Sequence, residues 1–255
     1  MLKWTLFAFT CLFGLAIGSF LNVCIYRLPL GRSIVKPRSA CPSCGKMISW
    51  YDNIPILSYI LLRAKCRECG EPISIGYPLV EALTAALAAG LYLQFGPTVQ
   101  MVIYFAFCCG QIIIAFVDLD HQIIPDVISL PGIVVGLACS FLLPQRFLES
   151  LIGAAAGGGA LFAVAFTYKR ITGREGMGLG DVKLLAMMGA FLGWKAIPFI
   201  ILISSLFGTL VGIGLIVLAG KGTKFAIPYG PFLSGAAIAY LFIGQRILSW
   251  YMAFH

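Results

Sequence analysis

The sequence predicts an all-α polytopic membrane protein with about eight transmembrane helices and a small polar domain between the first two. Of its 255 residues, 60% are hydrophobic and only 11% are charged, whereas soluble domains carry roughly 25% charged residues. The apolar residues fall into long runs, and a run of about 20 such residues crosses a bilayer as a helix. The one long polar segment, residues 27–78, contains two pairs of cysteines.

The chain divides into a first transmembrane helix (1–26), a polar domain (27–78) and a membrane domain of about seven helices (79–255). In the first helix, Gly14 and Gly18 form a face of small residues that favours close helix packing. We expect no cleavable signal peptide there, because no small-residue cleavage site followed by a soluble domain appears. The other candidate spans are approximately 79–96, 99–117, 126–143, 150–168, the short run 182–194, 197–219 and 229–250.

The distribution of basic residues predicts the orientation of the helices, because Lys and Arg accumulate on the cytoplasmic side of a membrane protein. If segment 27–78 is cytoplasmic, fourteen of the 18 Lys and Arg residues lie inside and four lie outside. We therefore expect both termini outside and the polar domain inside. The same arrangement brings Asp118 and Asp181 to one membrane face, although no acid entered the count. We interpret the net charge of +8 as part of this topology signal, and we expect no nucleic-acid partner.

The polar domain contains two CxxC pairs, Cys41-Pro42-Ser43-Cys44 and Cys66-Arg67-Glu68-Cys69. Two such pairs at this separation are typical of a zinc ribbon. Four thiolates leave no open coordination position, so the ion would be structural, and a reducing cytoplasm favours metal over a disulfide. The alternatives are a redox pair, or cysteines that share no role. We predict a cytoplasmic zinc-ribbon-like domain with Zn²⁺ bound by Cys41, Cys44, Cys66 and Cys69.

Acidic residues gather at the ends of two predicted spans. Gly176-Met177-Gly178-Leu179-Gly180 is a glycine-rich turn that leads into Asp181, and Asp118, Asp120 and Asp126 follow the span at 99–117. Two close carboxyl groups that share one proton can supply both the base and the acid of amide hydrolysis. Asp181 and Asp118 are therefore a candidate aspartic-protease pair, with Asp120 and Asp126 as competitors that spacing alone does not exclude.

Three other interpretations of these acids remain open from the residues alone. The acids could be solvated loop residues, with Asp181 as the N-cap of the helix that follows. They could mark an ion or proton pathway in a transporter, whose acids would lie near the membrane midplane. The chain could also be a zinc-bearing membrane scaffold without chemistry. The glycines do not indicate a nucleotide-binding loop, because no strand precedes them; they permit close approach of another backbone.

At these residues the chain resembles the prepilin peptidases, bifunctional membrane aspartic proteases that process type IV pilins and type II secretion pseudopilins. The motifs match in order along most of the chain. They are Gly18-Ser19-Phe20-Leu21-Asn22-Val23 with Tyr26-Arg27-Leu28-Pro29, then Asp52-Asn53-Ile54-Pro55, Tyr77-Pro78-Leu79-Val80-Glu81, Asp118-Leu119-Asp120 through Ile124-Pro125-Asp126, and Gly178-Leu179-Gly180-Asp181. The last is the GxGD motif, which presenilin-like proteases share more loosely.

The resemblance implies that Asp118 and Asp181 are the two catalytic residues. It further implies a bacterial inner-membrane enzyme that removes a short basic leader from prepilins on the cytoplasmic side, typically after Gly. The enzyme then methylates the new N-terminal residue, usually Phe, with S-adenosylmethionine as donor. No motif marks the site of the methyl donor, and the cysteine-bearing segment is the expected organiser of that half. Further contributors are expected among Gly178, Gly180, Asp120, Asp126, Glu81, Asp52, Asn53 and Lys183.

Overall fold

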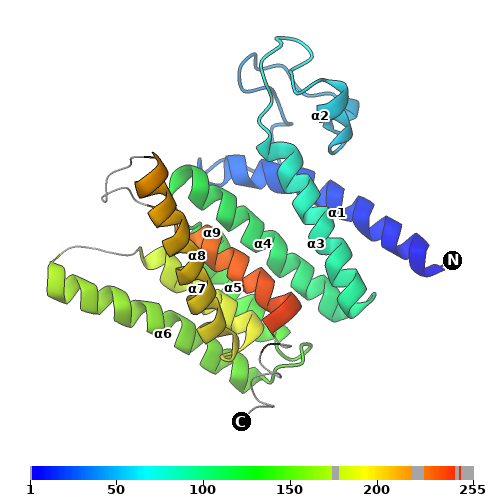
Figure 1. Cartoon of the computed structure of the whole chain (residues 1–255). Helices are drawn as coiled ribbons and strands as arrows, with labels where there is room; N and C mark the ends of the chain where they lie inside the picture. The colour runs from blue at the N-terminus through cyan, green and yellow to red at the C-terminus, as the bar shows by residue number, and fades with distance from the viewer. Residues whose placement is uncertain (1, 174–177, 220–226, 245–246, 248–255) are drawn as a thin grey trace. The chain divides into compact units, whose positions relative to one another are not determined.

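The computed structural model describes residues 2–173, 178–219, 227–244 and 247. Within these residues the chain is helical, and β-structure is limited to two isolated bridges, Ala40–Met47 and Lys65–Pro72. The predicted all-α class is therefore confirmed. The elements are α1 (Leu2–Arg27), η1 (Trp50–Asn53), α2 (Leu57–Leu61), α3 (Gly76–Phe95), α4 (Val99–His121), α5 (Asp126–Cys139), α6 (Phe147–Thr172), α7 (Leu179–Leu192), α8 (Ala196–Ala219), α9 (Gly230–Ala239) and η2 (Tyr240–Gly244) (Figure 1).

Five of these helices, α1, α3, α4, α6 and α8, are long and apolar enough to cross a membrane. The chain is thus a multi-pass membrane protein. α5 and the α9–η2 segment are shorter apolar helices, and α7 has only 14 residues. A helix of that length covers about 21 Å, less than the hydrocarbon core of about 30 Å. Each of the eight predicted spans contains a helix, but the number of helices that cross the membrane stays a prediction. Part of the last span, at 245–246 and 248–250, lies outside the described residues.

The chain forms two compact units that divide between Ile113 and Ile114, within α4. In the first unit α1 packs along α3, and glycines make this contact possible. A Cβ added to Gly14 would lie 2.8 Å from the Cα of Ala85, and one added to Gly18 would lie 2.6 Å from the Cα of Glu81. An alanine at either position would force the helices apart, so the close packing predicted for this face is confirmed.

In the second unit α7 is enclosed by its neighbours α5 and α6, and eight of its 14 residues are buried. Glycines again allow the approach. A Cβ added to Gly157 of α6 would lie 2.5 Å from the carbonyl oxygen of Leu185, and one added to Gly136 of α5 would lie 2.8 Å from the Phe191 ring. The small-residue run at 153–160 therefore makes a close helix contact. This packing fixes α7, whose first turn carries Asp181.

Candidate active site and metal centre

Asp118 lies in the last turn of α4, and only 5% of its surface is exposed. Its Oδ2 accepts a hydrogen bond of 2.9 Å from the backbone N–H of Gly230, the first residue of α9. A buried carboxylate is costly without such a donor. The approach is close, because a Cβ added to Gly230 would lie 2.7 Å from that oxygen. The end of α4 and the start of α9 therefore meet at Asp118.

Asp181 is the third residue of α7. The N-terminal turn of a helix favours an acid, since its free N–H groups carry partial positive charge. The N-cap is Gly178, whose backbone is extended, so the alternative in which Asp181 caps this helix is wrong. Asp181 lies near enough to Asp118 for their charges to interact. The structure thus brings two acids from distant parts of the sequence to one place.

The two competing acids have different surroundings. Asp120 is exposed. Asp126, the first residue of α5, is also exposed, and both of its carboxylate oxygens accept hydrogen bonds of 2.8 Å from the Nζ of Lys183. This ion pair gives both carboxylate oxygens of Asp126 a hydrogen-bond donor and joins α5 to α7. Of Asp118, Asp120 and Asp126, Asp118 is the one whose charge acts on Asp181.

The two described glycines of the GxGD turn differ in their surroundings, and Gly176 and Met177 lie outside the described residues. A Cβ added to Gly180 would lie 3.0 Å from the Cβ of Ile124, in the loop that connects α4 to α5. A Cβ added to Gly178 would have ordinary clearance, with its nearest neighbours at 3.8 and 4.0 Å. Gly180 thus packs tightly against Ile124, whereas Gly178 leaves room beside Asp181.

The Sγ atoms of Cys41, Cys44, Cys66 and Cys69 all lie within 4.8 Å of one another. The two CxxC turns have the same backbone structure. Gly45 donates to the carbonyl of Cys41 at 2.9 Å, and Gly70 donates to the carbonyl of Cys66 at 3.0 Å. Both glycines have positive φ, 72° and 71°, which glycine adopts without strain. Two matching turns therefore present four thiols to one point.

The dimensions of this cluster fit zinc. A tetrahedral ion with Zn–S bonds of about 2.3 Å holds its sulfur atoms about 3.8 Å apart, and the Sγ atoms of Cys41 and Cys69 are 3.8 Å apart. The backbone N–H groups of Cys44 and Ser43 lower the pKa of the Cys41 thiol to about 6, which favours the thiolate form that binds a metal ion. None of the four cysteines forms a disulfide among the described residues. The donor set therefore suits a structural metal ion.

Comparison with known proteins identifies the family of the chain. Residues 12–95 match the bacterial peptidase A24 N-terminal domain, and residues 105–213 match the type IV leader peptidase family. The prepilin leader peptidase/N-methyltransferase of Aeromonas hydrophila is 39% identical to this chain, over 98% of this chain and 95% of its own. The chain belongs to the type IV leader peptidase family.

Other relatives in this family carry the same name. The prepilin leader peptidase/N-methyltransferase of Pseudomonas aeruginosa is 39% identical, over 96% of this chain and 93% of its own. That of Myxococcus xanthus is 44% identical, over 84% of this chain but 64% of its own. No solved structure matches the chain significantly. The resemblance inferred from the motifs is confirmed, while the roles of individual residues stay predictions.

Several motif residues of this family member meet at the base of the polar domain. Glu81 of α3 is buried, and its Oε2 accepts a hydrogen bond of 2.7 Å from the backbone N–H of Ile56. The side-chain amide of Asn22 of α1 donates to the carbonyl of Tyr77 at 3.1 Å. Ile56 has a φ of 59°, a strained value for a β-branched residue. Glu81 therefore anchors a strained point of the loop.

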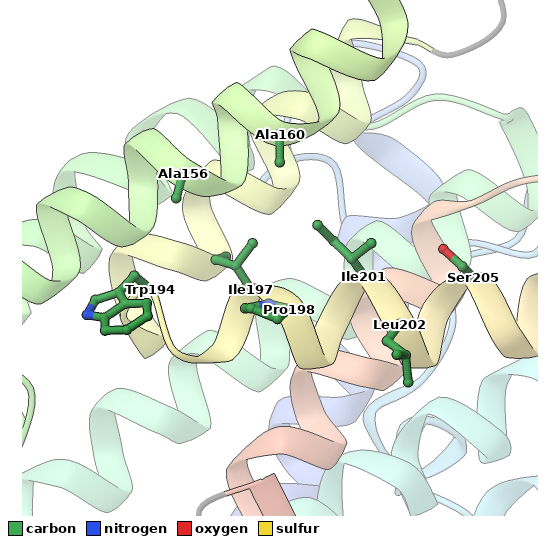
Figure 2. Close-up of a pocket in the computed structure, with 8 residues that line it drawn as sticks. All are labelled: Ala156, Ala160, Trp194, Ile197, Pro198, Ile201, Leu202 and Ser205. Atoms are coloured by element: carbon green, nitrogen blue, oxygen red, sulfur yellow. The ribbon is translucent and has the colours of Figure 1, made fainter. Parts of the chain in front are cut away.

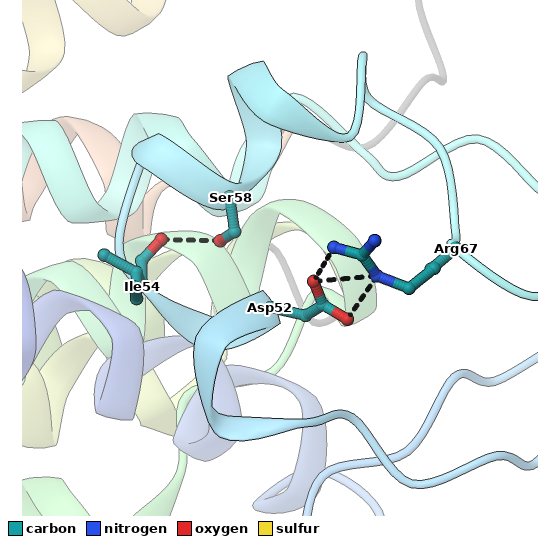
Figure 3. A network of polar contacts seen from close by, with 4 residues as sticks. All are labelled: Asp52, Ile54, Ser58 and Arg67. Carbon is teal, nitrogen blue, oxygen red and sulfur yellow. Dashed lines mark hydrogen bonds and ion pairs between the residues drawn. The ribbon is translucent and has the colours of Figure 1, made fainter.

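Asp52 ties the polar domain together (Figure 3). The guanidinium of Arg67 donates to its carboxylate oxygens over distances of 2.6 to 3.1 Å, so the segment between the cysteine pairs is joined to the second pair. The Oγ of Ser58 also donates to the carbonyl of Ile54 in this network. Asn53 is exposed. Asp52 thus has a structural partner, and its predicted contribution to a methyl-transfer site is untested.

An open groove of about 670 Å³ lies between α6 and α8 (Figure 2). It is lined by Ala156, Ala160, Trp194, Ile197, Pro198, Ile201, Leu202 and Ser205. Ser205 is the only hydroxyl of this lining, and no lining residue is an acid, a base or a metal ligand. The groove lining therefore offers no acid, base or metal ligand for catalysis, and Asp118 and Asp181 remain the candidate catalytic groups of this unit.

Sequence reasoning missed Gly230. It lies 112 residues from Asp118 along the chain, and its contribution is a backbone N–H that any residue except proline has. The only local signal is the position of Tyr229-Gly230-Pro231 at the start of an apolar run. Proline favours the first turn of a helix, so this signal indicates a helix start but not a contact.

Proposed function

We propose that this protein is a prepilin leader peptidase and N-methyltransferase of the bacterial inner membrane. It removes the short basic leader of type IV prepilins or type II secretion pseudopilins, typically after Gly. It then methylates the new N-terminal residue, usually Phe. The observation that carries the proposal is the proximity of buried Asp118 to Asp181 of the GxGD motif, in a chain of the type IV leader peptidase family.

In the proposed cleavage, one carboxylate of the pair takes a proton from water while the water oxygen attacks the scissile carbonyl carbon. The other carboxyl group gives its proton to the carbonyl oxygen. The tetrahedral intermediate then breaks its C–N bond, and the leaving nitrogen receives the proton that water had lost. Two carboxyl groups can divide these tasks because ionising both at close range is unfavourable. Their titration belongs to the pair rather than to either residue.

The proposed topology places the acid pair and the polar domain at the cytoplasmic face, with eight helices crossing the membrane. Its support is the excess of Lys and Arg in the segments that this orientation leaves inside. Asp118 and Asp181 then lie at helix ends on the side where the leader of an inserted prepilin emerges. A transporter would instead need its acids near the midplane at interrupted helices.

We infer that the four cysteines of the polar domain hold a structural zinc ion. Their matching turns and sulfur separation support this assignment. Binding would order a domain that has no buried hydrophobic residue between positions 27 and 78, because metal binding to thiolates supplies folding free energy. S-adenosylmethionine would supply the methyl group to the new terminal amine, and the polar domain would organise this half of the function.

The direct experiment incubates the purified protein, in lipid, with a prepilin and labelled S-adenosylmethionine. Leader loss is followed by electrophoresis, and label on the new N-terminus is followed separately. We expect both. Leader loss without label would remove the methyltransferase half of the proposal, and an intact leader would contradict the peptidase half. Cleavage would also exclude the transporter and the scaffold as complete descriptions.

A further inference from the structure

The two acids of the pair have unequal surroundings. Asp118 receives the N–H of Gly230 on its Oδ2, whereas within the described part of the chain no donor reaches the Asp181 carboxylate. An N–H bonds about twice as strongly to an ionised carboxylate as to a neutral group. When the pair shares one proton, the proton therefore belongs on Asp181, the acid that no donor among the described residues reaches.

The N–H of Gly230 is held in a fixed direction. The carbonyl of Tyr229 accepts hydrogen bonds of 3.1 Å from the N–H groups of Phe232 and Leu233, so that it starts α9. The hydroxyl of Tyr229 lies 2.7 Å from the Oγ of Ser204 and 3.1 Å from that of Ser205, both on α8. The first N–H groups of a helix have no partner within it, and that of Gly230 is directed at Asp118.

We propose that Gly230 is a positioning residue that makes Asp118 the base of the pair and leaves the shared proton on Asp181. Tyr229 acts through Gly230, because its hydroxyl attaches the start of α9 to α8. This inference rests on the proposed peptidase function and adds to it a division of labour between the two acids.

The cleavage then proceeds in a defined order. Asp118 keeps Oδ2 on the N–H of Gly230 and takes a proton from water on Oδ1, while the water oxygen bonds to the carbonyl carbon. Asp181 gives its proton to the carbonyl oxygen. When the C–N bond breaks, Asp118 passes its proton to the leaving nitrogen and Asp181 recovers a proton from the new hydroxyl. Both acids end as they began, and one water has been added across the amide.

The close fit at Gly230 provides a test with a matched control on the same helix. In Gly230→Ala the new Cβ would lie 2.7 Å from Asp118 Oδ2, so the carboxylate must move off its donor. In Gly235→Ala nothing lies within 4 Å of the new Cβ. Loss of a hydrogen bond to a charged group predicts a decrease in kcat of about 10- to 100-fold for Gly230→Ala. KM should change little, and Gly235→Ala should cleave at the wild-type rate.

The pH profile of kcat/KM distinguishes a positioning role of Gly230 from a purely structural role in helix packing. Among the described residues, Asp181 of α7 is the titratable group on which the charge of Asp118 acts, Asp120 is exposed, and Lys183 and Asp126 are paired with each other. Loss of the hydrogen bond from Gly230 raises the pH at which the Asp118 carboxyl group ionises. The acidic limb of the kcat/KM profile should therefore move to higher pH in Gly230→Ala.

Tyr229→Phe adds no volume to the helix. This variant therefore tests the same inference if Gly230→Ala fails to insert into the membrane. Loss of the hydroxyl should move the acidic limb in the same direction by a smaller amount. Wild-type pH profiles in Tyr229→Phe and in Gly230→Ala would overturn the inference. Equal losses in Gly230→Ala and Gly235→Ala would also overturn it, since helix packing would then explain both. A wild-type protein that cleaves no prepilin would contradict the proposed function instead.

Discussion

The ammonium group of Lys183 lies 2.8 Å from both carboxylate oxygens of Asp126 and joins the start of α7 to the start of α5. Asp181 is two residues before Lys183, and Asp126 follows the loop that leads from Asp118. The ion pair thus connects the two segments that carry the candidate catalytic acids. Both partners are partly exposed, so the ion pair contributes about 1 kcal/mol or less to stability. We therefore expect its main role to be positioning the two helix ends relative to each other.

We predict that Lys183→Met slows leader cleavage by about tenfold with little change in thermal stability, because small misplacements of reacting groups are costly. Asp126→Asn should have the same effect, and the double variant should be no slower than either single variant. Lys195→Met is the matched control, since it breaks a comparable exposed pair, with Glu149. Equal rates in Lys183→Met and Lys195→Met would contradict a geometric role for the Asp126 pair.

The cysteine cluster predicts about one zinc ion for each chain. Elemental analysis of the purified protein should find it, and Cys41→Ser or Cys66→Ser should lose most of it. Cys11→Ser is the control, because this cysteine lies in α1, outside the cluster. Loss of metal should make residues 27–78 sensitive to protease. A metal content well below one equivalent in wild-type protein would exclude the zinc assignment.

Glu81 predicts a separate effect on the polar domain. Glu81→Ala leaves the N–H of Ile56 without its acceptor, at a cost of about 1–3 kcal/mol, while Ile56 remains strained. We expect faster proteolysis of segment 27–78 and weaker methylation of the cleaved substrate. Glu71→Ala, an exposed change in the same domain, should alter neither. Protease resistance identical in the two variants would show that Glu81 does not anchor the loop.

Features with a strong local signal could be predicted from the sequence. Apolar runs predict the helices, because a membrane helix must be apolar along its length. The spacing of the CxxC pairs predicts the cysteine cluster, because each turn is a local structure. Gly14 and Gly18 predict a close contact of α1 with another helix, and the structure identifies that helix as α3.

Features that depend on tertiary contacts could not be predicted. Asp118, Asp120 and Asp126 look alike in the sequence, and residue spacing does not show that Asp126 bonds to Lys183 or that Asp118 is buried. The contact of Gly230 with Asp118 uses a backbone N–H, which leaves no trace in residue type. The strain at Ile56 is likewise invisible in the sequence, because a β-branched residue normally avoids a positive φ and nothing beside it predicts one. Family resemblance, rather than spacing, selected Asp118.

The rate of leader cleavage by Asp118→Asn and Asp181→Asn tests the central claim most directly, with Asp120→Asn as the matched control. Each variant keeps the shape of the side chain and replaces one carboxylate with a neutral amide. We predict that Asp118→Asn and Asp181→Asn insert normally but cleave a prepilin at least roughly 10³-fold more slowly, while Asp120→Asn cleaves at close to the wild-type rate. Wild-type cleavage by either Asp118→Asn or Asp181→Asn would contradict the assignment of these two residues as the catalytic pair.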